Sequence, residues 1–261
     1  MVVQKLLTIR GDIPKQLNNG LILAGIIFLI MVWGITAKLL SSPVFPSPWK
    51  VVSSLKELHF EDALVRNLFY SIKLNILGYI EAMVIAIPLG FLIGLFPLTK
   101  GLFSKQIDAL RFVPLTAVTG LFIAWFGIED TMKVNFLAFG IIVYLLPVVV
   151  QRVADVEKVH EQAVTTLGAT QWQTIRTVFI PSVLAKISDD IRVLVAISWT
   201  YIIVAELVNK SGGIGALAYT SARQSRLDKM FAILLIIIVV GFIQDKLFEI
   251  VDRIAFKYKH I

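Results

Sequence analysis

Long runs of apolar residues alternate along the chain with short charged or polar stretches. A helix needs about 20 mostly apolar residues to cross a lipid bilayer, and only helices or closed barrels satisfy their backbone hydrogen bonds there. Six runs are long enough, or nearly so, at residues 20–40, 71–96, 112–126, 134–150, 191–208 and 230–248. The pattern predicts an all-α membrane protein of about six transmembrane helices, with residues 1–19 as a tail and 20–261 as one transmembrane domain.

Two local features refine this prediction. Pro43, Pro46 and Pro48 interrupt the chain after the first span, and proline cannot continue a helix, so we expect a loop outside the lipid there. A short amphipathic surface helix is expected over residues 49–60. On the second span, small residues recur every four positions, which predicts a face that packs closely against another helix. They are Ala86, Gly90 and Gly94.

Composition supports the membrane assignment and excludes several classes of site. Hydrophobic residues make up 57% of the chain, above the roughly 45–50% of soluble domains. The net charge is +7, but the basic residues flank apolar runs, which favours a membrane surface over nucleic acid. No cysteine is present and the three histidines lie far apart, so we expect no thiol chemistry and no metal site. More Lys and Arg residues are cytoplasmic if both termini are, which favours that orientation.

The long polar segment between the fourth and fifth spans has an apolar side at helical spacing. Gly168 interrupts it and predicts a turn between two short helices, because glycine is unfavourable inside a helix. Pro181 is expected to close the segment. Such a hairpin either docks on another protein or packs on this protein's own inner surface, and the residues leave both open. The apolar side comprises Val164, Leu167, Trp172, Ile175 and Phe179.

This segment resembles the coupling loop of the permease subunits of binding-protein-dependent ABC importers. That family has Glu-Ala-Ala, three residues, glycine, nine residues, and Ile-x-Leu-Pro. Aligned on Gly168, the first three positions are Gln162, Ala163 and Val164, and the last is Pro181. Gln162 departs from the family's usual glutamate, which weakens any charged contact carried over to it.

Other segments are similar to the nitrate/taurine/sulfonate-type subfamily, in the same order. They begin at Phe45 (FPSPWKVV), Arg111 (RFVPLTA), Trp125 (WFGI), Val204 (VAEL), Gly212 (GGIG) and Gly241 (GFIQD). The resemblance covers most of the chain from about residue 45 onward. It implies a type I ABC importer permease fold in a bacterial cytoplasmic (inner) membrane, with both termini in the cytoplasm.

The resemblance also implies the partners. These are a second permease subunit, expected as a homodimer, two ATP-binding subunits, and an extracytoplasmic solute-binding protein. The loop over residues 152–190 would dock on the ATPase as a coupling helix. The coupling residues that it implies are Gln162, Ala163, Gly168, Ala169, Trp172 and Pro181.

The chain has no G-x-x-x-x-G-K-[ST] motif, so ATP and magnesium are expected on the partner rather than here. No catalytic constellation is evident. The pair Asp189 and Asp190 could do acid–base chemistry, but acids in the first turn of the fifth span explain it better. We therefore expect a transport subunit and not an enzyme.

Polar residues on the spans are candidates for the translocation pathway, although hydrogen bonding between helices also uses such residues. Glu206 near the end of the fifth span either serves the pathway or anchors the helix, for instance by pairing with Lys210. An ion-coupled secondary transporter is the alternative function, and a membrane enzyme a third. Nitrate, taurine, another sulfonate, bicarbonate and a vitamin precursor are all compatible solutes. The other pathway candidates are Thr116, Thr119, Ser198, Thr200 and Tyr201.

Overall fold

A computed structural model describes residues 14–259, apart from the side chain of Asn209, and every element in that part is helical. Five helices are long and apolar enough to cross a membrane, and a sixth crossing is counted if one bent pair is a single span. The prediction of an all-α membrane protein with about six spans is confirmed. The elements are α2 (Lys15–Leu40), α3 (Pro48–Phe60), α4 (Leu64–Leu95), α5 (Pro97–Leu110), α6 (Leu115–Phe126), α7 (Asp130–Ala154), α8 (Lys158–Thr166), α9 (Gln171–Thr174), the π-helical η1 (Ile175–Phe179), α10 (Ile180–Asn209), α11 (Ile214–Arg223), α12 (Leu227–Ala255) and the 3-10 turn η2 (Lys257–Lys259).

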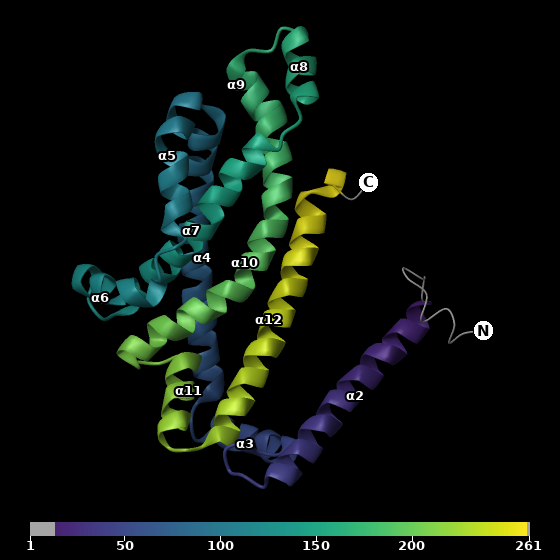
Figure 1. The fold of residues 1–261 in the computed structure, drawn as a ribbon, viewed down its shortest axis with the longest axis vertical. Coiled ribbons are helices and arrows are strands. Elements are labelled where there is room, and N and C mark those ends of the chain that lie inside the picture. Colours follow the sequence, from purple (N-terminus) through teal and green to yellow (C-terminus); the bar gives the residue numbers. More distant parts are fainter. Residues whose placement is uncertain (1–13, 260–261) are drawn as a thin grey trace.

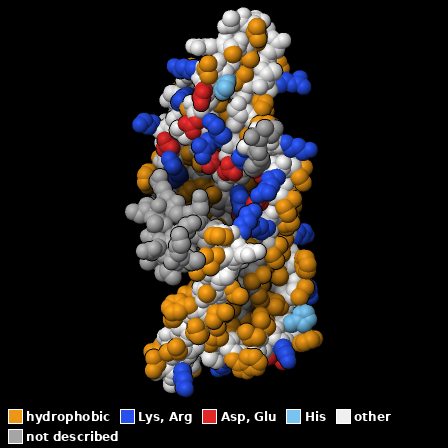
Figure 2. All heavy atoms as spheres, turned by 90° about the vertical axis from the view of Figure 1, so that its right-hand side faces the viewer, with side chains coloured by type: hydrophobic (Ala, Val, Ile, Leu, Met, Phe, Trp, Pro, Cys, Tyr) orange, Lys and Arg blue, Asp and Glu red, His pale blue; other side chains and the backbone are white. Residues whose placement is uncertain are grey.

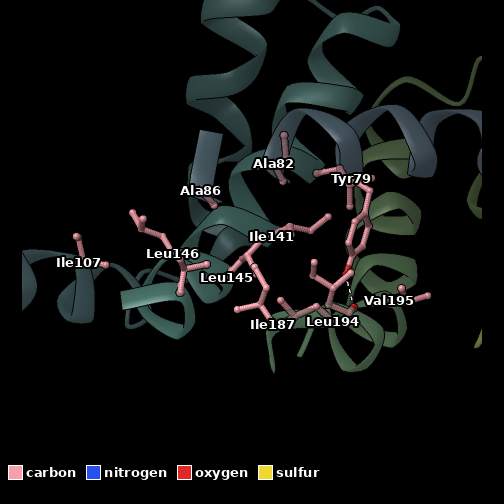
Figure 3. Close-up of a cluster of buried hydrophobic side chains, with 14 of the residues drawn as sticks. Tyr79, Ala82, Ala86, Ile107, Ile141, Leu145, Leu146, Ile187, Leu194 and Val195 are labelled. Atoms are coloured by element: carbon pink, nitrogen blue, oxygen red, sulfur yellow. Dashed lines mark hydrogen bonds between the residues drawn. The ribbon is translucent and has the colours of Figure 1, made fainter. Parts of the chain in front are cut away.

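The core lies between α4, α7 and α10 (Figure 1). Figure 3 shows how Ala82 and Ala86 from α4 face Ile141 and Leu145 from α7, with α10 closing the cluster. Tyr79 on α4 is buried within it, and its hydroxyl donates to the carbonyl of Ile191 at 2.7 Å. The share of buried residues is larger in α7 than in the other spans, so α7 is the central helix.

Glycines on α4 allow α7 to approach it closely along its whole length. A Cβ at Gly78 would lie 2.8 Å from Leu137, one at Gly90 2.5 Å from Val149, and one at Gly94 2.8 Å from Val153. Ala86 on the same face is fully buried. The predicted packing face is therefore confirmed. The contacts advance together along both helices, so α4 and α7 are parallel neighbours and need a crossover between them.

That crossover corrects the third predicted span. Residues 112–126 were expected to cross the membrane, but α6 has only 12 residues, about 18 Å of helix. It is bent by 104° from α5, and Figure 1 shows it projecting sideways at mid-height of the bundle. The cause is local, since Pro114 lacks an amide hydrogen and disfavours helix in the residue before it.

The fifth predicted span also begins earlier than expected. Helical structure runs from Gln171 through the π-helical turn η1 into α10, and Pro181 lies in the first turn of α10 rather than closing the segment. Proline is tolerated in a first turn because its missing N–H needs no partner there. Asp189 and Asp190 therefore lie well inside a helix. Asp190 accepts two hydrogen bonds from Arg152 and Asp189 pairs with Lys259, so the pair is structural and not a helix start.

The outer helices expose apolar side chains on much of their surface, as lipid-facing helices do. Only Ala37 is buried on α2, which starts at Lys15, within the predicted tail; residues 1–13 lie outside the described part. Figure 2 shows a broad hydrophobic surface over the lower half and charged side chains gathered toward the upper half. The predicted surface helix is α3, where Ser47 accepts the first-turn amide of Lys50. Arg226 bonds Glu57 on α3 and keeps the pKa of that carboxyl below its usual value.

Candidate functional site

The predicted hairpin is present at the end of the bundle opposite α3 and α11 (Figure 1). Helices α8 and α9 flank a turn at Gly168, whose φ of +83° favours glycine. Thr170 starts α9 with a capping box, in which its side chain accepts the amide of Gln173 and Gln173 accepts the amide of Thr170. The turn between two short helices is therefore confirmed.

The apolar side of this segment divides between two environments. Ile175 and Phe179 are half-buried, and Phe179 packs on the core, which fits the interpretation that the segment covers its own protein. By contrast, Leu167 is 88% exposed and Trp172 66% exposed. No residue of α8 is buried. Within the described chain, the hairpin thus leaves Leu167 at its tip almost fully exposed and Trp172 on α9 about two-thirds exposed.

The six predicted coupling residues lie along this hairpin and the helix that follows it. Gln162 and Ala163 are exposed on α8, and Gly168 is exposed in the turn. A pocket of about 300 Å³ separates the hairpin from the corner between α4 and α5, and Ala169 is part of its wall. Trp172 is exposed on α9, whereas Pro181 is half-buried and its carbonyl accepts a hydrogen bond from Tyr258 near the C-terminus.

A second pocket, of about 240 Å³, lies where α5 bends into α6. Three of the predicted pathway residues meet there, although they come from helices far apart in sequence. Thr116 and Thr200 are exposed toward it and Tyr201 is half-buried. The sequence did not single out Arg111 and Tyr144 as site residues, yet both line the same pocket. We call this space the corner pocket.

The other two hydroxyl candidates do not line the corner pocket. Thr119 bonds back to the carbonyl of Leu115 on its own helix, at 3.4 Å. Ser198 is fully buried and exchanges hydrogen bonds with Asn75 on α4, at 3.0 and 3.2 Å. Ser198 therefore joins α10 to α4, which is the alternative expected for polar residues on packed spans.

Glu206 is fully buried in a polar joint at the other end of the bundle. Its carboxylate accepts the hydroxyl of Ser71 on α4 at 2.5 Å and the amide of Gly215 on α11 at 2.7 Å. Ser71 in turn accepts the amide of Ile214. The glutamate thus fastens α10 and α11 to α4. Lys210 does not pair with Glu206, because its ammonium lies 4.0 Å from the ring centre of Tyr219.

A buried lysine extends this joint to α7. Lys133 has no exposed surface, and its ammonium donates to the hydroxyls of Tyr70 and Ser211 at 2.9 Å each. Tyr70 also donates to Asp130. A buried ammonium is costly unless it is paired and hydrogen-bonded. Hydropathy gave no sign of this residue, although the spacing of Asp130 and Lys133, three apart on one helix, hints at a polar helix end.

Replacing Glu206 with glutamine tests the role of the joint. One of its two acceptor oxygens becomes an NH2 group, which cannot accept a hydrogen bond. The side chain therefore loses its bond from either Ser71 or Gly215, and losing such a bond costs about 1–3 kcal/mol. We expect a lower midpoint of thermal unfolding and reduced uptake. The matched control is Lys210→Gln, which leaves the joint intact. If both variants unfold at the wild-type temperature, Glu206 does not hold the three helices together.

Comparison with known proteins agrees with this geometry. Residues 86–256 match the family described as "Binding-protein-dependent transport system inner membrane component". The chain is 30% identical over 247 residues to the "Putative aliphatic sulfonates transport permease protein SsuC" of Bacillus subtilis, covering 93% of this chain and 88% of that one. It is 29% identical to the "Taurine transport system permease protein TauC" of Escherichia coli, covering 83% and 82%.

Solved structures of similar fold also come from ABC transporters. The chain matches the inward-facing MetNI methionine ABC transporter with a TM-score of 0.66 at 16% identity, over 73% of this chain and 94% of that chain. An amino acid ABC transporter matches with a TM-score of 0.56 at 19% identity, over 78% and 97%. These likenesses show the type I importer permease fold. The chain therefore belongs to the family of inner-membrane components of binding-protein-dependent transport systems, and it is the permease of an ABC importer.

Proposed function

We propose that two copies of this chain form the pathway for a small anion, with two ATPase subunits docked on the hairpins. A soluble binding protein delivers the solute to the opposite end, near α3 and α11. ATP and magnesium are bound by the ATPase partners and not by this chain. The hairpin end and both termini face the cytoplasm of a bacterial inner membrane.

The observation that carries this proposal is the exposed tip of the hairpin. Leu167, which is 88% exposed, projects from the turn at Gly168, and Trp172, which is 66% exposed, follows on α9 at the edge of an apolar pocket beside α4. Exposed apolar groups rimmed by polar residues are typical of a protein–protein contact. The orientation fits as well, since α2 runs toward α3 and α12 ends near the hairpin, so both ends of the described chain are directed toward the hairpin end (Figure 1).

Two further observations support an anionic solute and the pathway residues. The names of the two relatives given above refer to the transport of aliphatic sulfonates and of taurine. The corner pocket, with Thr116, Thr200 and Tyr201 in its wall, lies beside the broken helix pair α5 and α6. Secondary transporters form solute sites at such helix breaks near the middle of the membrane, and a helix break offers the same free backbone groups here.

Uptake by the reconstituted complex tests the proposal. The chain, its ATPase and its binding protein are placed in liposomes, and entry of radiolabelled ethanesulfonate or taurine is measured. We expect uptake that requires ATP and persists when proton and sodium gradients are collapsed. Uptake driven by an ion gradient without ATP would contradict the proposal, as would the absence of uptake of any tested anion by an assembled complex.

A further inference from the structure

The corner between α5 and α6 holds an arginine about halfway along the bundle. Helix α5 starts directly after α4 and contacts both α4 and α7. Its 14 residues cover about 21 Å, less than half of the roughly 48 Å covered by the 32 residues of α4. Arg111 follows α5 directly, so it lies well below the charged end of the bundle. A charged side chain at such depth is expensive and marks a solute pathway or a site by default.

The surroundings of Arg111 suit an oxyanion. Among the residues lining the corner pocket it is the only charged one, and the polar groups around it are hydroxyls. Thr116, Thr200, Tyr144 and Tyr201 bring hydroxyl groups, and since Tyr201 is hydrogen-bonded to Tyr144, three O–H groups are left to donate to an anion. The rest of the wall is mostly apolar. At about 240 Å³ the pocket is smaller than the roughly 300–1,000 Å³ of sites for drug-sized ligands, which suits a small solute.

The guanidinium has donors to spare. Arg111 donates from Nη2 to Asp108 at 2.6 Å, and within the described residues this is its one hydrogen-bond partner. A guanidinium carries five N–H donors in a planar fork that matches carboxylates and other oxyanions. Both side chains of the pair are about half exposed, at 45% and 54%, so the pair is weak and open to competition.

We propose that Arg111 is the charge-selective contact of the pathway and binds the anionic head group of the solute in the corner pocket. The inference rests on the proposed function and names the residue that recognises the negative charge of the solute. Asp108 holds the guanidinium toward the pocket when no solute is present, and the solute displaces it. The hydroxyls of Thr116 and Thr200 complete the shell around the head group.

A purely structural role is the competing explanation, in which Arg111 and Asp108 simply clasp the last turn of α5. The two explanations predict opposite behaviour for the two partners. If the pair is structural, removing either charge causes the same defect. If Arg111 receives an anion, removing Arg111 weakens anion attraction, whereas removing the competing Asp108 charge strengthens it.

The chain has no cysteine, so a single cysteine can report the local potential. Thr116→Cys is introduced into the full chain, in membrane fragments open on both sides. Its reaction rates with an anionic sulfonatoethyl and a cationic trimethylammonium-ethyl methanethiosulfonate are compared. A unit charge several ångström away changes the encounter of a charged reagent by about tenfold. We expect a preference for the anionic reagent that Arg111→Gln lowers by about tenfold or more, Arg111→Lys keeps, and Asp108→Asn raises.

Several results would overturn the inference. These are an unreactive thiol at position 116, a rate ratio that Arg111→Gln leaves unchanged, or equal effects of Arg111→Gln and Asp108→Asn. Uptake of ethanesulfonate by the reconstituted complex is a second readout. Arg111→Gln should lower this uptake at least tenfold, whereas Arg111→Lys should retain part of it. Labelling needs no transport, so the two hypotheses fail separately. A complex without uptake contradicts the proposed function, whereas wild-type uptake by Arg111→Gln contradicts the role of Arg111.

Discussion

Replacing Gly90 with leucine is expected to prevent the chain from accumulating as a folded membrane protein. A Cβ at this position would lie 2.5 Å from both Cβ and Cγ1 of Val149. Leucine adds three more carbons beyond that clash, in a fully packed contact between α4 and α7. Overpacking a core costs about 1–3 kcal/mol for a few extra methylene groups, and a helix pair that cannot separate costs more. The measurement is the yield of monodisperse protein extracted from the membrane.

The chain offers matched controls for this variant. A Cβ at Gly25 in α2 would meet nothing within 4 Å, so Gly25→Leu should leave the yield of monodisperse protein unchanged. Both Cβ and Cγ1 of Val149 take part in the clash, so Gly90→Ala should be defective, and Gly90→Ala with Val149→Gly, which removes both atoms, should recover part of the yield. If Gly90→Leu accumulates as well as the wild type, close packing of α4 on α7 is not needed for folding.

Replacing Gly168 with valine is expected to reduce ATP-driven uptake strongly while the spans stay folded. A Cβ at this position would meet nothing within 4 Å, so bulk is not the constraint. The constraint is the φ of +83°, which costs a β-branched residue about 1–2 kcal/mol or more. Since α8 buries no residue, little packing opposes a change of the turn. A shift of that size changes the population of the native turn by about 5–30-fold.

The matched control at the turn is Gly168→Asn, because asparagine tolerates left-handed backbone far better than valine. The asparagine variant should keep most of the uptake and should co-purify with most of the ATPase subunit, whereas the valine variant should lose most of both. Equal behaviour of the two variants would show that the backbone conformation of the turn does not matter for coupling.

The sequence was sufficient for the fold class but not for the ends of the helices. Hydropathy located the spans because burial in lipid requires apolar residues over a fixed length. It could not show that η1 and α10 form one helical stretch, because a proline usually ends a helix. Pro181 is tolerated here because it lies in the first turn of α10. It also missed that α5 and α6 share one bent crossing, since Pro114 indicates a break in the helix but not its angle, which is 104°.

The candidate sites divide in the same way. Spacing around Gly168 located the hairpin, because a turn and two short helices are local features. The joint at Glu206 could not be predicted, since it binds Ser71, which is 135 residues away in sequence. The sequence placed Arg111 in a segment similar to the subfamily but not among the candidate pathway residues. Its depth became evident once the length of α5 and the bend were known.

Site-specific photocross-linking tests hairpin docking most directly. A single cysteine at Leu167, which is 88% exposed at the tip, carries a benzophenone in the complex assembled with its ATPase. The control is a cysteine at Phe60 on α3, which is 81% exposed at the opposite end of the bundle (Figure 1). We expect the probe at position 167 to attach covalently to the ATPase and the probe at position 60 not to do so. Attachment from position 60 alone, or from neither position in an intact complex, would contradict docking through the hairpin.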